Sequence, residues 1–157
     1  MYVPTRFFVT HGTATSPVSD LNAFDLALMN AGMAEQNLVA VSSVIPEGAV
    51  LTEDRTMPRG MVTFCVLAQS RGSGLLSAGI AYAYRKDGKG GYVAESHLHG
   101  SELSVRRDLE AKMKEMARIR GIELGEVSFE TASIDVPDGE HGCALASLVF
   151  TERTCTQ

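Results

Sequence analysis

The sequence predicts an α/β protein of the α+β type, with a mixed or antiparallel sheet and a single domain over residues 1–157. Three observations support this. The chain is 45% hydrophobic and 21% charged, and its length suits one domain with a proper core. About seven segments read as strands and only two as helices. With so few helices, many strand neighbours must be linked by hairpins, which favours a mixed or antiparallel sheet over a doubly wound one.

The N-terminal region predicts a strand, a loop and a helix. Residues 6–10 (RFFVT) read as the strand and residues 11–20 (HGTATSPVSD) as the loop. Residues 20–32 (DLNAFDLALMNAG) predict a helix that Ser19 or Asp20 can cap. Its apolar positions at helical spacing, and the glycine expected at its end, are Leu21, Phe24, Leu28, Ala31 and Gly32.

Residues 37–45 (NLVAVSSVI) form a near-continuous apolar segment, typical of a strand buried on both faces. Two adjacent serines, Ser42 and Ser43, interrupt this segment, and Pro46 follows closely. The pair of hydroxyl groups at the end of a predicted core strand is the least ordinary feature of the chain.

The middle of the chain predicts three more strands. Residues 60–69 (GMVTFCVLAQ) and 75–84 (LLSAGIAYAY) read as strands, joined by a flexible turn at residues 70–74 (SRGSG). Residues 85–91 (RKDGKGG) indicate a second turn, before a short strand at residues 92–96 (YVAES).

The longest predicted helix begins at Ser101 or Ser104 and runs to about Arg120. Its apolar stripe and terminal glycine are Val105, Leu109, Met113, Met116, Ile119 and Gly121. Residues 126–135 (EVSFETASID) and 143–152 (CALASLVFTE) read as the last two strands.

Charge and composition exclude several classes of function. A net charge of -5 and a pI of about 5.3 argue against a nucleic-acid footprint and an anionic membrane surface. No apolar run approaches the roughly 18 residues that span a bilayer, and no secretory signal is evident. The cysteines, Cys65, Cys143 and Cys155, lack metal-site spacing, so we expect reduced thiols and a cytoplasmic protein.

The serine pair has an ordinary interpretation and a chemical one. Serines often satisfy backbone groups where a strand ends. Alternatively, Ser43 Oγ can attack the carbonyl of Ser42 in a strained backbone, giving an ester whose elimination and hydrolysis leave a pyruvoyl group. Pro46 would stiffen the far side, and Asn37 could donate to the developing oxyanion. Neither serine has the G-x-S-x-G context of a hydrolase, which leaves a serine hydrolase as a minor alternative.

A longer pattern around the serines is more specific. The motifs LNAFDLALMNAG, NL and VSSVIPE (residues 21–47) resemble the N-terminal part of pyruvoyl-dependent arginine decarboxylases. That family has an L-N-A-F-D helix, an asparagine before the strand, and a Ser-Ser self-cleavage site followed by proline. MPRG, YVAES, EMARIRGIEL and HGCALAS follow in matching order, so the resemblance covers most of the chain. Residues 51–90 diverge, and one proline stands where familiar members often have two.

The resemblance implies a role for each matching residue. The Ser42–Ser43 bond would be cleaved, giving a β fragment (residues 1–42) and an α fragment (residues 43–157) that begins with a pyruvoyl group made from Ser43. Asn37 matches the asparagine implicated in cleavage, Glu95 the proposed proton donor, and Asp25 the aspartate that pairs with the substrate guanidinium. The implied fold is a four-layer αββα sandwich, assembled as trimers with active sites between subunits.

The implied function is the conversion of L-arginine to agmatine and CO2, for polyamine synthesis or acid resistance. A pyruvoyl group accepts electrons as CO2 leaves, as pyridoxal phosphate does elsewhere, so no pyridoxal phosphate and no metal are expected. A partly buried glutamate can then supply a proton, and a guanidinium group favours a planar carboxylate that accepts two hydrogen bonds. Expected partners are arginine and further copies of the chain, but neither nucleic acid nor membrane.

Several alternatives remain open. Asp25 can be an ordinary helix aspartate, Asn37 a turn residue and Glu95 a surface carboxylate. The two histidines of HLH (residues 97–99) would share one strand face, and with His141 they suggest a metal site, but no matching acid or cysteine cluster is evident. An unprocessed trimeric homologue with a binding or structural role, or a decarboxylase of another amino acid, are the rival functions.

Overall fold

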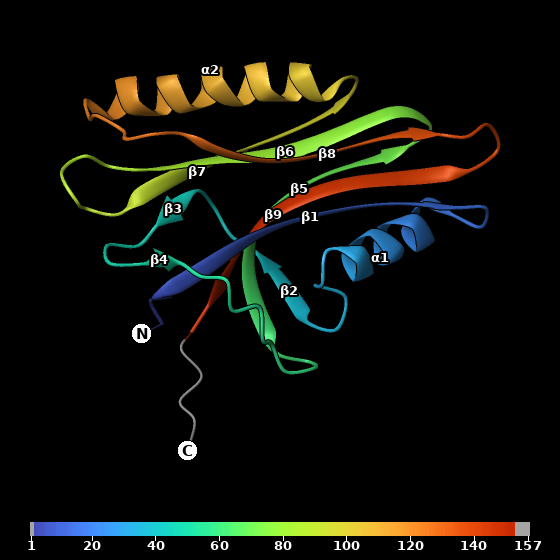
Figure 1. The fold of residues 1–157 in the computed structure, drawn as a ribbon, viewed down its shortest axis with the longest axis horizontal. Coiled ribbons are helices and arrows are strands. Elements are labelled where there is room, and N and C mark those ends of the chain that lie inside the picture. The colour runs from blue at the N-terminus through green and yellow to red at the C-terminus, as the bar shows by residue number, and fades with distance from the viewer. Residues whose placement is uncertain (1, 153–157) are drawn as a thin grey trace.

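The computed structural model describes residues 2–152 and has four layers (Figure 1). They are helix α2 (Glu102–Arg120), a four-stranded sheet, a five-stranded sheet and helix α1 (Asp20–Asn30). The strands are β1 (Arg6–Ser16), β2 (Asn37–Ala40), β3 (Val44–Ile45), β4 (Val50–Leu51), β5 (Val62–Gly72), β6 (Gly74–Tyr84), β7 (Gly91–His99), β8 (Ser128–Val136) and β9 (His141–Thr151). The predicted fold class and the αββα layering are confirmed.

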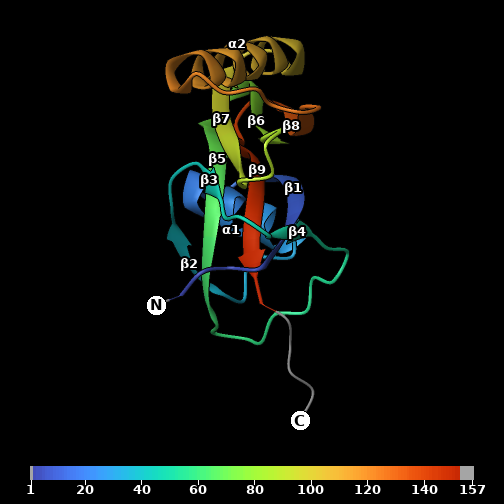
Figure 2. The same cartoon turned by 90° about the vertical axis from the view of Figure 1, so that its left-hand side faces the viewer.

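Antiparallel pairing dominates both sheets, but the expected hairpins are few: among the neighbouring strands of residues 2–152, only β6 and β7 are consecutive in the chain. The five-stranded sheet has the order β2-β5-β9-β1-β4, and β1 pairs with β9 in antiparallel fashion from end to end. The short β2 and β4 add parallel pairs at its two opposite edges (Figure 2). The second sheet has the order β3-β7-β6-β8, and all its pairs are antiparallel. The prediction of a mixed, mainly antiparallel architecture therefore holds.

Apolar side chains fill the three spaces between the layers. Phe7 and Leu148 belong to the core between the two sheets. Ala27 of α1 packs on the outer face of the five-stranded sheet. Val105 and Leu109 of α2 pack on the outer face of the four-stranded sheet. Each sheet is thus covered on both faces, which explains the apolar runs in β6 and β9.

The predicted helix ends are confirmed. Ser19 caps α1 by accepting the Asn22 N–H at 3.1 Å, and Ser101 caps α2 by accepting the Ser104 N–H at 3.2 Å. Gly121 ends α2 in the left-handed conformation, with φ of 61°.

The predicted apolar stripes are partly wrong. In α1 the buried face is formed by small residues together with Leu28, whereas Leu21 is 64% exposed. In α2, Ile119 is 66% exposed and lines a surface pocket. Small residues let α1 lie close to the sheet, a feature that a count of large apolar residues overlooks.

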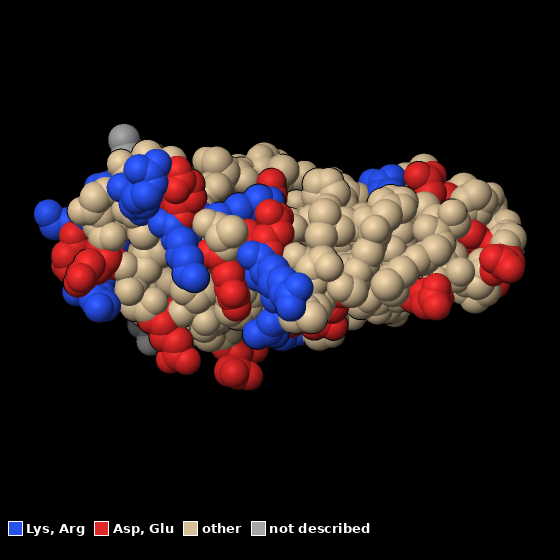
Figure 3. Space-filling model, turned by 90° about the horizontal axis from the view of Figure 1, so that it is seen from above, with Lys and Arg blue, Asp and Glu red and all other residues tan. Residues whose placement is uncertain are grey.

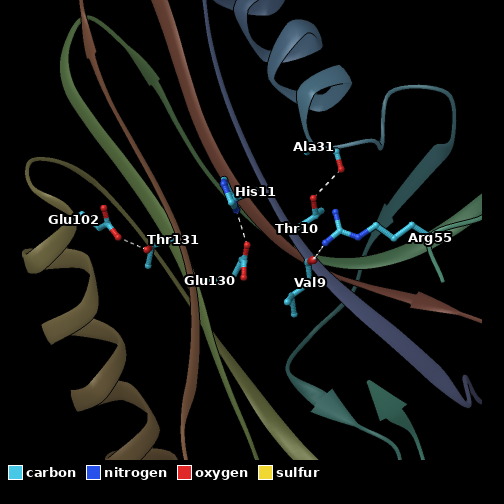
Figure 4. Close-up of polar contacts among 8 residues, drawn as sticks. All are labelled: Val9, Thr10, His11, Ala31, Arg55, Glu102, Glu130 and Thr131. Atoms are coloured by element: carbon cyan, nitrogen blue, oxygen red, sulfur yellow. Dashed lines mark hydrogen bonds and ion pairs between the residues drawn. The ribbon is translucent and has the colours of Figure 1, made fainter. Parts of the chain in front are cut away.

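The loop predicted at residues 11–20 is wrong, because β1 continues to Ser16. Its second half pairs with β9 up to Ser16↔His141 and carries polar residues that the sequence pattern did not mark as strand. α1 crosses this half closely, and Thr10 Oγ1 donates to the Ala31 carbonyl at 2.8 Å (Figure 4). A Cβ on Gly12 would lie 2.3 Å from the Ala27 carbonyl oxygen, so only glycine permits this approach.

Gly12→Ala is expected to destabilise the protein by about 2–3 kcal/mol, because the added methyl group must push α1 off the sheet. Urea unfolding followed by circular dichroism measures the change. Gly125→Ala is the matched control: the nearest atom to its new Cβ would be the Tyr84 oxygen at 3.5 Å, an ordinary contact. Equal unfolding midpoints for the two variants would contradict the close packing.

Residues 37–45 do not form one buried strand. The chain pairs as β2 in one sheet, leaves both sheets at residues 41–43, and pairs again as β3 in the other. β2 is an edge strand, and Val39 is 39% exposed. The predicted turn at residues 70–74 shrinks to Ser73, since β5 continues to Gly72 and β6 begins at Gly74. The local pattern cannot tell that a run of apolar residues changes sheets.

Polar side chains tie the layers together outside the cores (Figure 4). His11 Nδ1 of β1 lies 2.5 Å from Glu130 Oε1 of β8, which joins the two sheets. Thr131, next along β8, donates to Glu102 at the start of α2. Arg55, in the long segment after β4, donates to the Val9 carbonyl at 3.1 Å.

Within residues 2–152, no helix has the length and apolar character needed to cross a bilayer. Cys65 and Cys143 are buried and free, and Cys155 lies outside the described residues. Burial raises the pKa of the Cys143 thiol to about 11 and also raises that of Cys65. Both thiols are therefore neutral packing groups near pH 7.

Candidate active site

The serine pair lies where the chain passes from one sheet to the other. On one side, the Val41 N–H donates to the Cys65 carbonyl of β5 at 2.9 Å. On the other, the Val93 N–H of β7 donates to the Ser43 carbonyl at 2.9 Å. The Ser42–Ser43 peptide bond thus joins two segments that are held by different sheets. Each segment keeps its own anchor if that bond is broken.

The two serines line different pockets. Ser43 is half-buried and lines a pocket of about 580 Å³ together with Glu95 and Lys112. Ser42 is exposed and lines a separate apolar pocket of about 350 Å³ beside Phe64. Ser43, and not Ser42, therefore shares a pocket with candidate acid-base groups.

The backbone that follows Ser43 packs closely against Gly90. Gly90 has φ of 76°, and a Cβ there would lie 2.3 Å from the Ile45 carbonyl oxygen. β3 therefore rests directly on the turn before β7. Non-glycine residues in the described chain avoid positive φ, so any strain at Ser42 does not take the form of a left-handed backbone.

Glu95 is one of several β7 residues that line this pocket, and its side chain is exposed within the single chain. The partial burial expected for a proton donor is thus not met within one subunit. The Glu95 carbonyl accepts a 2.8 Å hydrogen bond from Lys112 Nζ of α2. Lys112 Nζ also lies 2.7 Å from Asp108 Oδ2, which accepts from Ser96 Oγ at 2.5 Å.

These hydrogen bonds change the pKa of Asp108. The hydrogen bond from Lys112, and secondly that from Ser96, lower the pKa of Asp108. Asp108 is then ionised at neutral pH and balances the charge of Lys112. Viewed from the α2 side, Lys and Arg side chains lie beside Asp and Glu side chains along the helix, in line with such pairing (Figure 3).

Asn37 lies away from this pocket. Its Nδ2 donates to the Gly60 carbonyl at 2.8 Å, and the residue lines a third pocket, of about 430 Å³, with Phe24 and Cys65. The side-chain amide is thus already used to hold the loop before β5. In the protomer it does not line the pocket of either serine.

Asp25 also lies away from the pocket that Ser43 and Glu95 line. It is exposed on α1, on the outer face of the five-stranded sheet, whereas Ser43 and Glu95 belong to the side of β3 and β7 (Figure 1). One subunit therefore brings together Ser43 and Glu95 but not Asp25.

The histidines do not gather into a metal site. Among residues 2–152, no group of three or more His, Cys, Asp or Glu side chains is placed to hold a metal ion. His97 lines the Ser43 pocket, and the His99 ring packs over Gly72.

The sequence reasoning missed Lys112, Asp108 and Ser96. The four-residue spacing of Asp108 and Lys112 indicates an ion pair on a helix, but such pairs are common on exposed helix faces. Only the tertiary fold places this pair over β7 at Glu95.

Comparisons with known proteins agree on one family. The family model described as pyruvoyl-dependent arginine decarboxylase matches residues 6–155. A protein of that name from Methanopyrus kandleri is 37% identical over 150 residues, which are 96% of this chain and 99% of the relative. A protein of the same name from Methanothermobacter thermautotrophicus is 30% identical, and the match covers 97% of this chain and 100% of that relative. The protein of that name from Thermococcus kodakarensis is 34% identical, and the match covers 94% of this chain and 95% of that relative.

Proposed function

The chain belongs to the pyruvoyl-dependent arginine decarboxylase family, and on that premise we propose that it converts L-arginine to agmatine and CO2 with a pyruvoyl group made from Ser43. The protein is thus a carboxy-lyase. The observation that carries the residue assignment is the pocket shared by Ser43 and Glu95, at a point where the chain crosses between sheets.

The surroundings of Ser43 suit such a group. A pyruvoyl group is about the size of a serine residue, and the Val93 N–H already donates to the carbonyl that the group would retain. The pocket gives a substrate amine access from one side. When present, the group supplies an electrophilic carbonyl that accepts electrons as CO2 leaves.

The proposed self-cleavage uses only this chain and water. Ser43 Oγ attacks the Ser42 carbonyl carbon, and the peptide nitrogen of Ser43 leaves, which gives an ester. Elimination then frees the Ser42 carboxylate and leaves a dehydroalanine, which water converts to the pyruvoyl group with release of ammonia. The anchors at Val41 and Val93 support this assignment, because they hold both new ends in place. Asn37 is proposed to act in the same step from a neighbouring copy of the chain, because within one chain it lines a different pocket.

Glu95 is proposed to donate the proton that replaces CO2 on the substrate carbon. It lines the same pocket as Ser43 and belongs to the strand that holds Ser43 in place. Its exposure in one subunit fits a site that a neighbouring subunit closes.

Asp25 is proposed to bind the substrate guanidinium group from a neighbouring subunit, in a trimer of αβ units. The separation of α1 from Ser43 within the protomer supports this arrangement. Exposed apolar side chains on α1 also support it, because a partner chain can cover them. Leu21, Leu26 and Met29 are 64%, 40% and 58% exposed. A cytoplasmic location is proposed too, in keeping with the free thiols of Cys65 and Cys143.

Asp25→Asn is expected to raise the KM for arginine about 100-fold, because the guanidinium group loses a charged, bidentate partner. Steady-state CO2 release measures the change. Asp20→Asn, in another exposed acid of α1, should leave KM nearly unchanged. If both variants bind arginine as the parent does, the guanidinium lies elsewhere.

Two measurements on the purified protein test the proposed function. Intact mass should show two fragments that break after Ser42, the larger one lacking a free amine. The processed protein should then release labelled CO2 from carboxyl-labelled arginine faster than from lysine, ornithine or histidine. A single uncleaved chain would favour the binding or structural homologue, and a preference for another substrate would overturn the arginine assignment.

A further inference from the structure

The edge of β7 is open beyond the point where β3 ends. β3 covers β7 only at Val44↔Tyr92 and Ile45↔Gly91, and the last backbone contact of this segment is the Val93–Ser43 hydrogen bond. Two residues further along β7, none of the strands in residues 2–152 pairs with Glu95 on this edge. An exposed strand edge of this kind is mobile unless something holds it.

Lys112 occupies the place that a pairing strand would take. Its Nζ donates to the Glu95 carbonyl at 2.8 Å. The ammonium group is held in turn by Asp108 at 2.7 Å, one turn earlier on α2. Asp108 accepts from Ser96 Oγ, so β7 is tied to α2 at two successive residues, Glu95 and Ser96.

We call the contacts that Lys112, Asp108 and Ser96 make around the Glu95 carbonyl the clamp. The clamp differs from an ordinary ion pair on a helix. An exposed ion pair four residues apart contributes little to stability and needs no third partner. Here Ser96 is 2% exposed and its hydroxyl is directed at Asp108, while Lys112 reaches past the pair to the backbone of Glu95. Lys112 and Asp108 also line the pocket that holds Ser43.

We propose that Lys112 is a positioning residue that, clamped by Asp108 and Ser96, holds the backbone of Glu95 in the orientation for proton transfer beside residue 43. This inference rests on the proposed function. Lys112 acts through Glu95 and needs no contact with the substrate. Proton transfer depends steeply on the placement of the donor, and an error of about 1 Å can cost about 100-fold in rate.

The first test needs no cofactor. In the full-length Ser43→Ala chain, Lys112→Met should speed amide hydrogen exchange in the segment of residues 94–98. Lys112→Arg should restore protection, because a guanidinium group can bond both a carbonyl and a carboxylate. Lys114→Met is the matched control, an exposed lysine of the same helix that lines a different pocket. Unchanged exchange in Lys112→Met would overturn the clamp.

The second test uses the processed enzyme. Lys112→Met should lower kcat about 10- to 100-fold with KM within about twofold of the parent, and Lys112→Arg should recover most of the rate. Self-cleavage, followed by intact mass, should stay complete in each variant. A fall in thermal stability with kcat unchanged would reduce Lys112 to a structural residue and overturn the proposal. If the parent neither cleaves nor decarboxylates, the proposed function fails with it, whereas the exchange result still decides whether the clamp exists.

Discussion

Ser43→Ala should remain a single chain of about 16.8 kDa under every condition in which the wild type is cleaved. The variant lacks the Oγ that attacks the Ser42 carbonyl, so no ester can form and no pyruvoyl group can arise. Decarboxylation should fall to the background rate. Intact-protein mass spectra of fresh and aged samples measure cleavage, and CO2 release measures activity.

Ser42→Ala is the matched control for this result. The attacked atom at residue 42 is the backbone carbonyl carbon, and the Ser42 side chain faces a different pocket from that of Ser43. We therefore expect Ser42→Ala to be cleaved at the same bond. Cleavage of Ser43→Ala, or wild-type cleavage at another bond, would show that Ser43 is not the precursor.

Glu95→Gln should be cleaved normally but lose kcat by about 10²–10⁴-fold, the usual contribution of a positioned acid or base. The amide keeps the shape of the side chain and removes its acidic proton. The KM for arginine should change little, since Asp25 rather than Glu95 is assigned to the guanidinium group. Steady-state formation of agmatine by the processed variant measures the effect, because the proton is added after CO2 has left.

Glu110→Gln tests whether any acid near α2 would give the same result. Glu110 is exposed on α2 and lines a pocket other than that of Ser43. Its kcat should match that of the parent. A Glu95→Gln variant with wild-type kcat would remove Glu95 from the proton-transfer step and leave its place in the pocket without a catalytic role.

The strongest predictions came from local features with a local cause. The caps at Ser19 and Ser101 and the left-handed Gly121 depend on hydrogen bonds and φ angles within a few residues. The apolar runs of β6 and β9 were also recognised as strands, because hydropathy is a property of consecutive residues. Where a polar strand is held mainly by its partner, as in residues 11–16, the local pattern read a loop.

The serine pair shows the limit most clearly. Its neighbours resemble a family motif, so the chemistry of Ser43 was predicted from residues 21–47 alone. The strand around it was misread as continuous, because alternation and hydropathy are the same whether a segment stays in one sheet or changes to another.

By itself, the sequence determined the class of fold, the helix ends, the family and the candidate residues, because these follow from short-range geometry and from a motif contiguous in the chain. Only the tertiary structure decided which candidates meet: Ser43 with Glu95 in one pocket, Asp25 and Asn37 elsewhere, and Lys112 on the Glu95 carbonyl. Those contacts join residues far apart in the chain, and their partners are set by how two sheets and a helix stack. A single sequence records no such distance.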